Sequence, residues 1–322
     1  MFKISMSRRH KIALTLGSLI VLTACGGGGD SSDSSANTET DTPLAQETTA
    51  AWSQRQDLYS MQLGKTSLTV DADFGARITS FKWNNSDVLY TSGSLNGSTF
   101  WTSPQSDWNW PPLAAHDSSP YAASVDEDVL TLTSDSANGI RITKIISPTP
   151  KGAFHIEYVM TNTSGSSIDV APWEVTRVST AGVNLFPVGE AYSGNSNLPP
   201  TQEDSILWYD HSGENDKKLF RDGAEQWIAH ASNGLVFIKH YSTDISIDEF
   251  ASGEAEIEIY ASNNYVELEQ QGAIEALVPG ESRSWHVVWQ LHELTEEITV
   301  EVGSPSLVEF IRQRLCPCNF GL

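Results

Sequence analysis

The sequence predicts an all-β fold, a large antiparallel sandwich or barrel. Short runs rich in β-branched and aromatic residues recur from Trp52 onward, each bounded by Asp, Asn, Gly, Pro or Thr. No strand-rich region alternates with helical segments of 3.6-residue period, so a parallel sheet is disfavoured. No repeat recurs at a fixed spacing, which disfavours a propeller.

The expected strands follow one another through residues 52–304, which we expect to form one domain. They are residues 63–70, 75–83, 88–90, 129–134, 140–147, 154–162, 168–178, 208–209, 226–231, 235–241, 255–260, 264–271 and 284–291. In the tail of residues 305–322, Leu307, Phe310 and Ile311 can share one face of a short helix over residues 306–315.

Residues 97–112 (GSTFWTSPQSDWNWPP) combine large aromatic side chains with three prolines. Proline interrupts the ladder of a strand, so we expect an ordered loop laid against a sheet and not a central strand. Aromatic rings stack on the apolar face of a pyranose, and polar tips bind its hydroxyls. Trp101, Gln105 and Trp110 are therefore candidate ligand-binding residues. The alternative is a loop that only covers the core.

The amino terminus predicts export and lipidation. Residues 1–24 join a basic start to a short apolar run, which is typical of a signal peptide and too short to span a bilayer. The small residues before Cys25 resemble a bacterial lipobox, which implies a lipid on Cys25 that attaches the chain to a membrane. Gly26 in the next position favours the outer membrane of a Gram-negative cell. Residues 25–51 are rich in Gly, Ser and Thr and predict a flexible tether.

The charge and the cysteines exclude several classes of function. A net charge of −22 disfavours nucleic acid as a partner, because the phosphate backbone is also anionic. No phosphate-binding, dinucleotide or metalloprotease motif is present, and we expect neither a cofactor nor a metal. Cys316 and Cys318 are too close for an unstrained disulfide and too few for a metal site, and their role stays open.

Three segments together resemble the galactose mutarotase-like superfamily, which includes the aldose 1-epimerases. They are LTVDADFGARITSFKWNNSDVLY at residues 68–90, FHIEYVMTNTSGSSIDVAPWEVTRV at residues 154–178 and NYVELEQQGAIEALVPGESRSWHVVW at residues 264–289. The resemblance covers most of residues 60–292. It implies a β-supersandwich that binds sugars, with residues 97–112 in the position of an active-site loop.

The resemblance also implies acid/base chemistry, with a glutamate on a late strand as the base. Period two places Tyr265, Glu267, Glu269 and Gln271 on one face of their strand. Glu267 is the first candidate for the base and Glu269 the second. The alternative is an ordinary exposed face on an acidic protein.

The histidine that serves as the acid in the epimerases has no match, since this chain has APWEVTR at residues 171–177. Glu174 could replace it if a dry pocket raised its pKa, and Trp173 and Arg177 could contact a saccharide. Lys239 lies among apolar residues and needs a partner, for which a cleft carboxylate or a ligand oxygen is a candidate. The catalytic pair would be Glu267 and Glu174, provided that both face one side of the sheet.

The sequence thus predicts an exported, lipid-anchored protein that binds a saccharide, with catalysis on sugars left open. The alternative function is a non-catalytic envelope scaffold that uses the fold for interactions.

Overall fold

The computed structural model describes residues 50–242 and 244–315. The predicted signal peptide, Cys25, nearly all of the tether, Cys316 and Cys318 lie outside the described residues. In the described part, no helix is long and apolar enough to cross a membrane.

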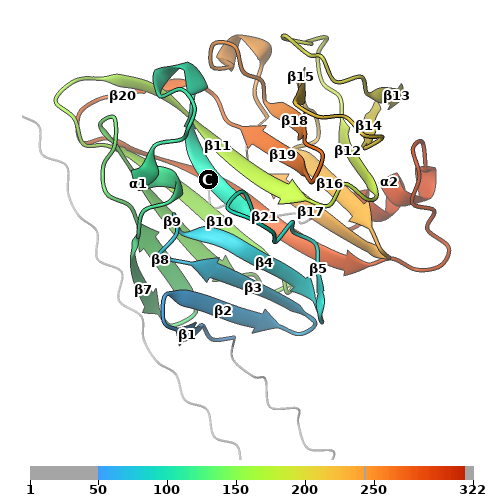
Figure 1. Cartoon of the computed structure of the whole chain (residues 1–322), viewed down its shortest axis with the longest axis horizontal. Coiled ribbons are helices and arrows are strands. Elements are labelled where there is room, and N and C mark those ends of the chain that lie inside the picture. Colours follow the sequence, from blue (N-terminus) through green and yellow to red (C-terminus); the bar gives the residue numbers. More distant parts are fainter. Residues whose placement is uncertain (1–49, 243, 316–322) are drawn as a thin grey trace, which may run out of the picture. The chain divides into compact units, whose positions relative to one another are not determined.

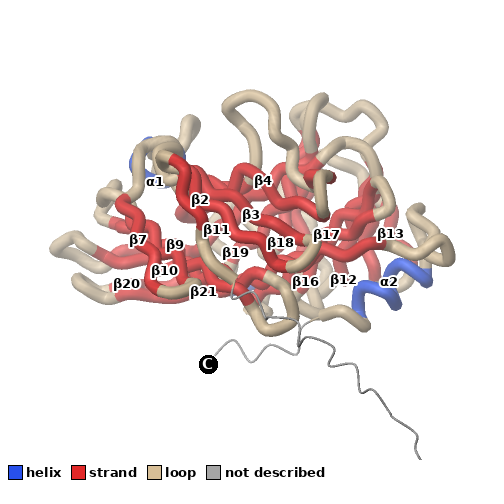
Figure 2. The backbone as a smooth tube through the Cα atoms, turned by 90° about the horizontal axis from the view of Figure 1, so that it is seen from below, coloured by secondary structure: helices blue, strands red, loops and turns tan. Residues whose placement is uncertain are grey.

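Two antiparallel sheets form the fold, and Figures 1 and 2 show them as two layers. The first sheet runs in the order β1 (Ser53–Arg55), β2 (Leu58–Leu63), β3 (Thr66–Asp71), β4 (Arg77–Trp83), β6 (Ser98–Ser103), β11 (Ile168–Val178), β19 (Val266–Gln271), β18 (Ile257–Ala261) and β15 (Lys217–Arg221), with β5 (Ser86–Asp87) paired to β4 and β20 (Glu275–Leu277) paired to β11.

The second sheet holds the remaining strands. Its order is β13 (Thr201–Glu203), β14 (Ile206–Asp210), β12 (Val183–Pro187), β16 (Trp227–Ser232), β17 (Leu235–Tyr241), β21 (Ser282–Glu293), β10 (Phe154–Asn162), β9 (Ile140–Pro148), β8 (Val129–Thr133) and β7 (Ala122–Asp126). Short helices are α1 (Ala114–Asp117), α2 (Pro305–Arg312) and the 3₁₀ turns η1 (Gln105–Asp107) and η2 (Ile247–Glu249).

The main core lies between the two sheets, because alternate residues of each strand point inward. Phe81 on β4 packs edge-on against Phe154 on β10 and Phe237 on β17, with ring centroids 6.0 and 5.4 Å apart. Phe100 on β6 stacks on Tyr158 of β10 at 4.1 Å. These contacts join the sheets face to face, as in a sandwich.

Helix α2 covers the outer face of the second sheet. Along β12, Phe186 points into the main core, whereas Leu185 belongs to a separate apolar cluster with Leu307 and Ile311 of α2. The helix begins where Ser304 accepts a hydrogen bond from the Leu307 N–H and Pro305 takes the first turn.

Three local expectations differ from the structure. Residues 88–90, expected as a strand, form only an isolated bridge from Leu89 to Val178. Residues 98–103 form β6, a fully buried central strand, although the sequence predicted a loop throughout residues 97–112. The reason is that all three prolines follow Ser103, so STFWTS keeps its β-branched and aromatic preference for a strand. Gly64, at a φ of +57°, turns the chain between β2 and β3 and divides the strand predicted at residues 63–70.

Candidate functional site

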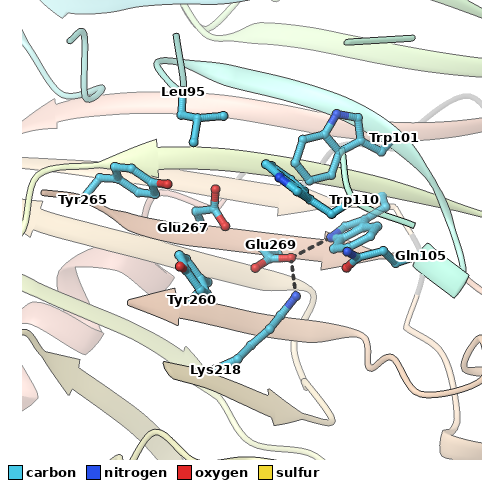
Figure 3. A pocket seen from close by; sticks show the side chains of 10 residues that line it. Leu95, Trp101, Gln105, Trp110, Lys218, Tyr260, Tyr265, Glu267 and Glu269 are labelled. Carbon is cyan, nitrogen blue, oxygen red and sulfur yellow. Dashed lines mark hydrogen bonds and ion pairs between the residues drawn. The ribbon is translucent and has the colours of Figure 1, made fainter. Parts of the chain in front are cut away.

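A pocket of about 410 Å³ lies on the outer face of the first sheet, the face turned away from the main core. Period two sets this arrangement: on β6 and β11, Phe100 and Glu174 point inward, and Trp101 and Trp173 point outward. Figure 3 shows the side chains that line the pocket. They are Leu95, Trp101, Gln105, Trp110, Trp173, Lys218, Tyr260, Tyr265, Glu267 and Glu269.

The register of four strands builds a polar row under this pocket. Arg177 on β11 lies opposite Glu267 on β19, and Glu267 lies opposite Tyr260 on β18. Tyr260 in turn lies opposite Lys218 on β15. Directly opposed residues of antiparallel strands are close neighbours, so residues far apart in the sequence share one floor.

Glu269 is held by two donors. The Trp173 Nε1–H donates to its Oε2 at 2.9 Å, and Lys218 Nζ donates to the same oxygen at 3.0 Å. Lys218 Nζ also lies 2.5 Å from Glu258 Oε2 and 4.9 Å from the centre of the Trp173 ring. Burial lowers the pKa of Lys218, but the charges of Glu258 and Glu269 outweigh it and raise that pKa above its usual value. Lys218 is therefore a fixed cation that bridges two carboxylates.

Glu267 presents a carboxylate to the pocket from the centre of the floor. Its Oε1 lies 2.7 Å from Arg177 Nε, and Arg177 is fully buried while the Glu267 side chain is 11% exposed. Burial raises the pKa of Glu267, Arg177 opposes that rise, and the charge of Glu269 adds to it. The net direction is upward, which brings this carboxyl closer to neutrality than a solvated glutamate.

Tryptophans form one wall of the pocket. The Trp101 ring meets Trp173 at 5.4 Å and Trp110 at 6.2 Å between centroids. Trp101 is buried and its Nε1–H donates to Asp117 Oδ1 at 3.0 Å, whereas Trp110 is 58% exposed. The backbone N–H of Gln105 donates to Glu254 Oε1 at 3.0 Å and holds the loop that follows β6. The wall thus has a fixed base and an exposed outer ring.

The structure gathers most of the residues that the sequence singled out. Arg177 lies directly behind Glu267 and within 5.6 Å of the Trp101 ring. The predicted residues that line the pocket itself are Trp101, Gln105, Trp110, Trp173, Glu267 and Glu269.

Glu174 and Lys239 lie on the other side of the sheet, so the predicted pair of Glu267 and Glu174 is wrong. Glu174 Oε2 lies 2.8 Å from Lys239 Nζ, with both side chains fully buried. The Tyr158 O–H donates to Glu174 Oε1 at 2.5 Å. Glu174 follows Trp173 directly, and one residue in a strand reverses the face. The partner of Lys239 is a carboxylate, as considered, but it lies in the core and not in a cleft.

Four lining residues escaped the sequence reasoning: Leu95, Lys218, Tyr260 and Tyr265. Tyr265 shares the face of Glu267 by period two, and that signal could have identified it. Lys218 and Tyr260 reach the pocket only through the pairing of β15 with β18 and of β18 with β19. Nothing in their own strands marks them as site residues.

The donors present do not suit a metal. Among residues 50–242 and 244–315, no group of three His, Cys, Asp or Glu side chains could hold a metal ion. The described lining of the pocket contains no histidine either.

Two face-to-face antiparallel sheets form a large β-sandwich, and solved structures of the mutarotase-like type share this fold, which confirms the predicted fold class. A "Putative aldose 1-epimerase" from Escherichia coli K12 superposes with a TM-score of 0.55 at 12% identity, over 74% of this chain and 99% of that chain. The Slr1438 protein from Synechocystis sp. PCC 6803 gives 0.54 at 13% identity, over 74% of this chain and 97% of that chain.

A TPR-domain containing protein from Parabacteroides distasonis gives a TM-score of 0.53 at 13% identity, over 76% of this chain and 49% of that chain. No protein-family model matches the chain, and no curated protein matches it by sequence. At such low identity, these likenesses establish the fold and leave the function to the site.

Proposed function

We propose that the pocket over β11, β19 and β18 binds a saccharide. The observation that carries this proposal is the composition of the pocket: aromatic rings form its wall while carboxylates form its floor. A sugar offers an apolar C–H face to a ring and hydroxyl donors to carboxylate oxygens. The pocket volume of about 410 Å³ lies within the range of small-ligand sites.

Binding to a glycan panel tests the proposal. Trp110→Ala removes an exposed ring, so we expect affinity to fall about tenfold or more without loss of stability. Glu267→Gln is expected to weaken binding by removing a charged acceptor. The matched control is Glu296→Gln, because Glu296 is exposed and does not line the pocket. If the wild-type protein binds no glycan of a broad panel, the proposal fails and the scaffold function takes its place.

A second candidate activity is the interconversion of sugar anomers. It is favoured by the raised pKa of Glu267, because general acid/base catalysis is most effective when the pKa lies near the working pH. The "Putative aldose 1-epimerase" from Escherichia coli K12 has a similar fold, which supports testing this reaction. Polarimetry on freshly dissolved sugars should detect faster mutarotation that Glu267→Gln abolishes. Saturable sugar binding without faster mutarotation would show that the protein binds sugars and does not interconvert their anomers.

The location forms part of the same proposal. We propose that the signal of residues 1–24 exports the chain and that a lipid on Cys25 anchors it to the envelope, facing the periplasm or the cell exterior. The tether of residues 25–51 would then let the pocket sample ligands away from the membrane surface.

A further inference from the structure

The charges around the pocket are unbalanced. Four carboxylates lie at the pocket or directly behind it, and they belong to Glu254, Glu258, Glu267 and Glu269. Two cations face them among the described residues: Lys218 bridges Glu258 and Glu269, and Arg177 pairs with Glu267. Arg77, farther back, is already paired with Asp117 at 3.0 Å. Burial raises the pKa of Glu258 well above its usual value, so we count the negative charge on the other three carboxylates. Glu254, Glu267 and Glu269 outnumber the two cations, Lys218 and Arg177.

Carboxylate oxygens also remain without donors. Glu269 is 1% exposed, and its Oε1 is buried with no hydrogen-bond partner while Oε2 takes both available donors. At Glu267, Oε1 faces Arg177, and Oε2 has no hydrogen bond or ion pair within the described part of the chain. Burial, followed by repulsion from Glu269, raises the pKa of Glu267 against the pull of Arg177. A cationic donor in the pocket would satisfy Glu267, whose side chain is partly exposed, whereas Glu269 Oε1 lies buried beneath the pocket surface.

The aromatic lining adds a second attraction for a cation. Trp101, Trp110, Tyr260 and Tyr265 line the same space as Glu267, and Figure 3 shows them around its carboxylate. The faces of such rings attract ammonium groups, and several rings together recognise alkylated amines in many proteins. Three rings of this pocket already have a cation over them: Lys218 Nζ lies over Trp173, and the Arg177 guanidinium lies over Trp101 and Tyr265. Among the lining rings, Trp110 and Tyr260 have no such partner within the described residues.

We propose that the saccharide of this pocket carries a protonated amine, so that the ligand class is an unacetylated amino sugar. This inference rests on the proposed function and names the class of sugar. The amine lies near Glu267 Oε2 between the aromatic rings, and the remaining hydroxyls bind Glu269 and Gln105. The same charges exclude uronates and phosphorylated sugars, since an anion would meet the excess carboxylates without a free cation.

Calorimetric titration with four disaccharides measures the effect of ligand charge on affinity. All four share the β-1,4 linkage and differ mainly in charge. The probes are the glucosamine disaccharide, its diacetylated form, cellobiose and a glucuronate-containing analogue. We expect the glucosamine disaccharide to bind at least about tenfold tighter than cellobiose and the glucuronate analogue to bind weakest. Acetylation removes the positive charge of each amine and adds a small acetyl group. The diacetylated form should therefore lose the tighter binding of the glucosamine disaccharide over cellobiose.

Two variants tie the preference to the site. Glu267→Gln should reduce the advantage of the amine over cellobiose to about twofold or less, while Glu296→Gln should leave it unchanged. Trp110→Ala should weaken the binding of all probes together. Because Trp110 is exposed, the variant should keep the wild-type melting temperature, which thermal unfolding checks.

The outcomes separate the inference from the function on which it rests. Equal affinity for cellobiose and the glucosamine disaccharide would overturn the amino-sugar inference and keep saccharide binding. Binding of tetramethylammonium without binding of any disaccharide would overturn both proposals, as would no binding of any probe. Tighter binding of the glucuronate analogue would contradict the charge argument directly.

Discussion

Glu174 and Glu267 lie on neighbouring strands of the first sheet but on opposite faces of it, and their roles differ accordingly. Trp173 and Arg177 on β11 point to the pocket, and Glu174 between them points into the core. There it neutralises Lys239 of the opposite sheet, and Lys239 Nζ also donates to the Leu268 carbonyl at 3.2 Å. Glu174 is thus a core residue that joins the two sheets, while Glu267 is the residue available to a ligand.

Glu174→Gln is therefore expected to destabilise the protein and spare the pocket. The substitution leaves Lys239 as an uncompensated buried cation, and the expected cost is about 3–5 kcal/mol in the free energy of unfolding measured with urea. The double variant Glu174→Gln with Lys239→Met removes both charges and should recover most of that loss. Loss of saccharide affinity in folded Glu174→Gln protein would contradict the placement of Glu174 outside the site.

The buried carboxyl group of Glu256 should make the stability of the fold depend on pH. It is fully buried before β18, and its Oε2 accepts from the Gly223 N–H at 2.8 Å. Burial raises its pKa from 4.5 to about 8, and the nearby Asp244 and Asp222 add to the rise. Because the folded state holds this proton more tightly than the unfolded state, its stabilising contribution is present below pH 4.5 and is lost as the pH rises toward 8.

Glu256→Gln keeps an acceptor for the Gly223 N–H and does not titrate. Relative to the wild type, we expect the variant to be more stable at about pH 9 than at about pH 5, by an amount on the order of a few kcal/mol. Urea unfolding at both pH values measures this difference, and the exposed Glu296→Gln should follow the wild type. Parallel pH profiles for wild type and Glu256→Gln would refute the buried-proton argument.

At the scale of elements, β6 and the loop after it connect the core to the pocket wall. The strand contributes Phe100 to the core and Trp101 to the pocket, and Pro104 ends it. Gly97 sets the entry to the strand, because its N–H donates to the Tyr90 carbonyl at 2.8 Å and its carbonyl accepts from the Arg177 N–H at 2.9 Å. The position of Arg177 behind Glu267 thus depends on this junction.

Gly97→Ala tests that dependence. Gly97 has a φ of +61°, and a Cβ there would lie 2.1 Å from the backbone oxygen of Ile78 on β4. The matched control is Gly64→Ala, which has a φ of +57° with no atom within 4 Å of the added Cβ. The control should cost about 1–2 kcal/mol from backbone strain alone. Gly97→Ala should cost at least about 1 kcal/mol more because β4 and β6 must separate, and equal losses in thermal or urea unfolding would refute this close approach.

At the scale of the whole molecule, each sheet has one face in the main core and a different use for its other face. The second sheet buries its outer face partly under α2, and the first sheet leaves an outer face where the pocket forms. A strongly acidic chain with a net charge of −22 is consistent with a pocket that favours cations over anions. In the proposed function, the ligand therefore binds to the first sheet, and the second sheet supports it from behind.

The proposed anchor leads to a prediction for the full-length chain in a Gram-negative host. Wild-type protein should incorporate a labelled fatty acid and sediment with the membranes, whereas Cys25→Ser should do neither, because the lipid chains supply the attachment. Cys316→Ser is the matched control and should behave as the wild type. Membrane attachment of Cys25→Ser at the wild-type level would contradict lipidation at this residue.

The sequence by itself determined the all-β class, the approximate strands and the face of β19 that carries Glu267 and Glu269. These features depend on local preference and on period two, which a single strand encodes. It also identified Trp101 and Trp110, since large rings beside turn-forming residues require an ordered position. Trp173 was found through the family resemblance of residues 171–177.

Only the tertiary structure decided which strands are neighbours and which sheet face meets the core. Lys218 and Tyr260 reach the floor through cross-strand pairing, and Glu174 lies on the core face of β11, where it meets Lys239 of the other sheet. Pairing between strands distant in sequence depends on the register and packing of the whole chain, and no strand carries that information alone. The composition of the pocket, and with it the proposed preference for an amino sugar, follows from this long-range register.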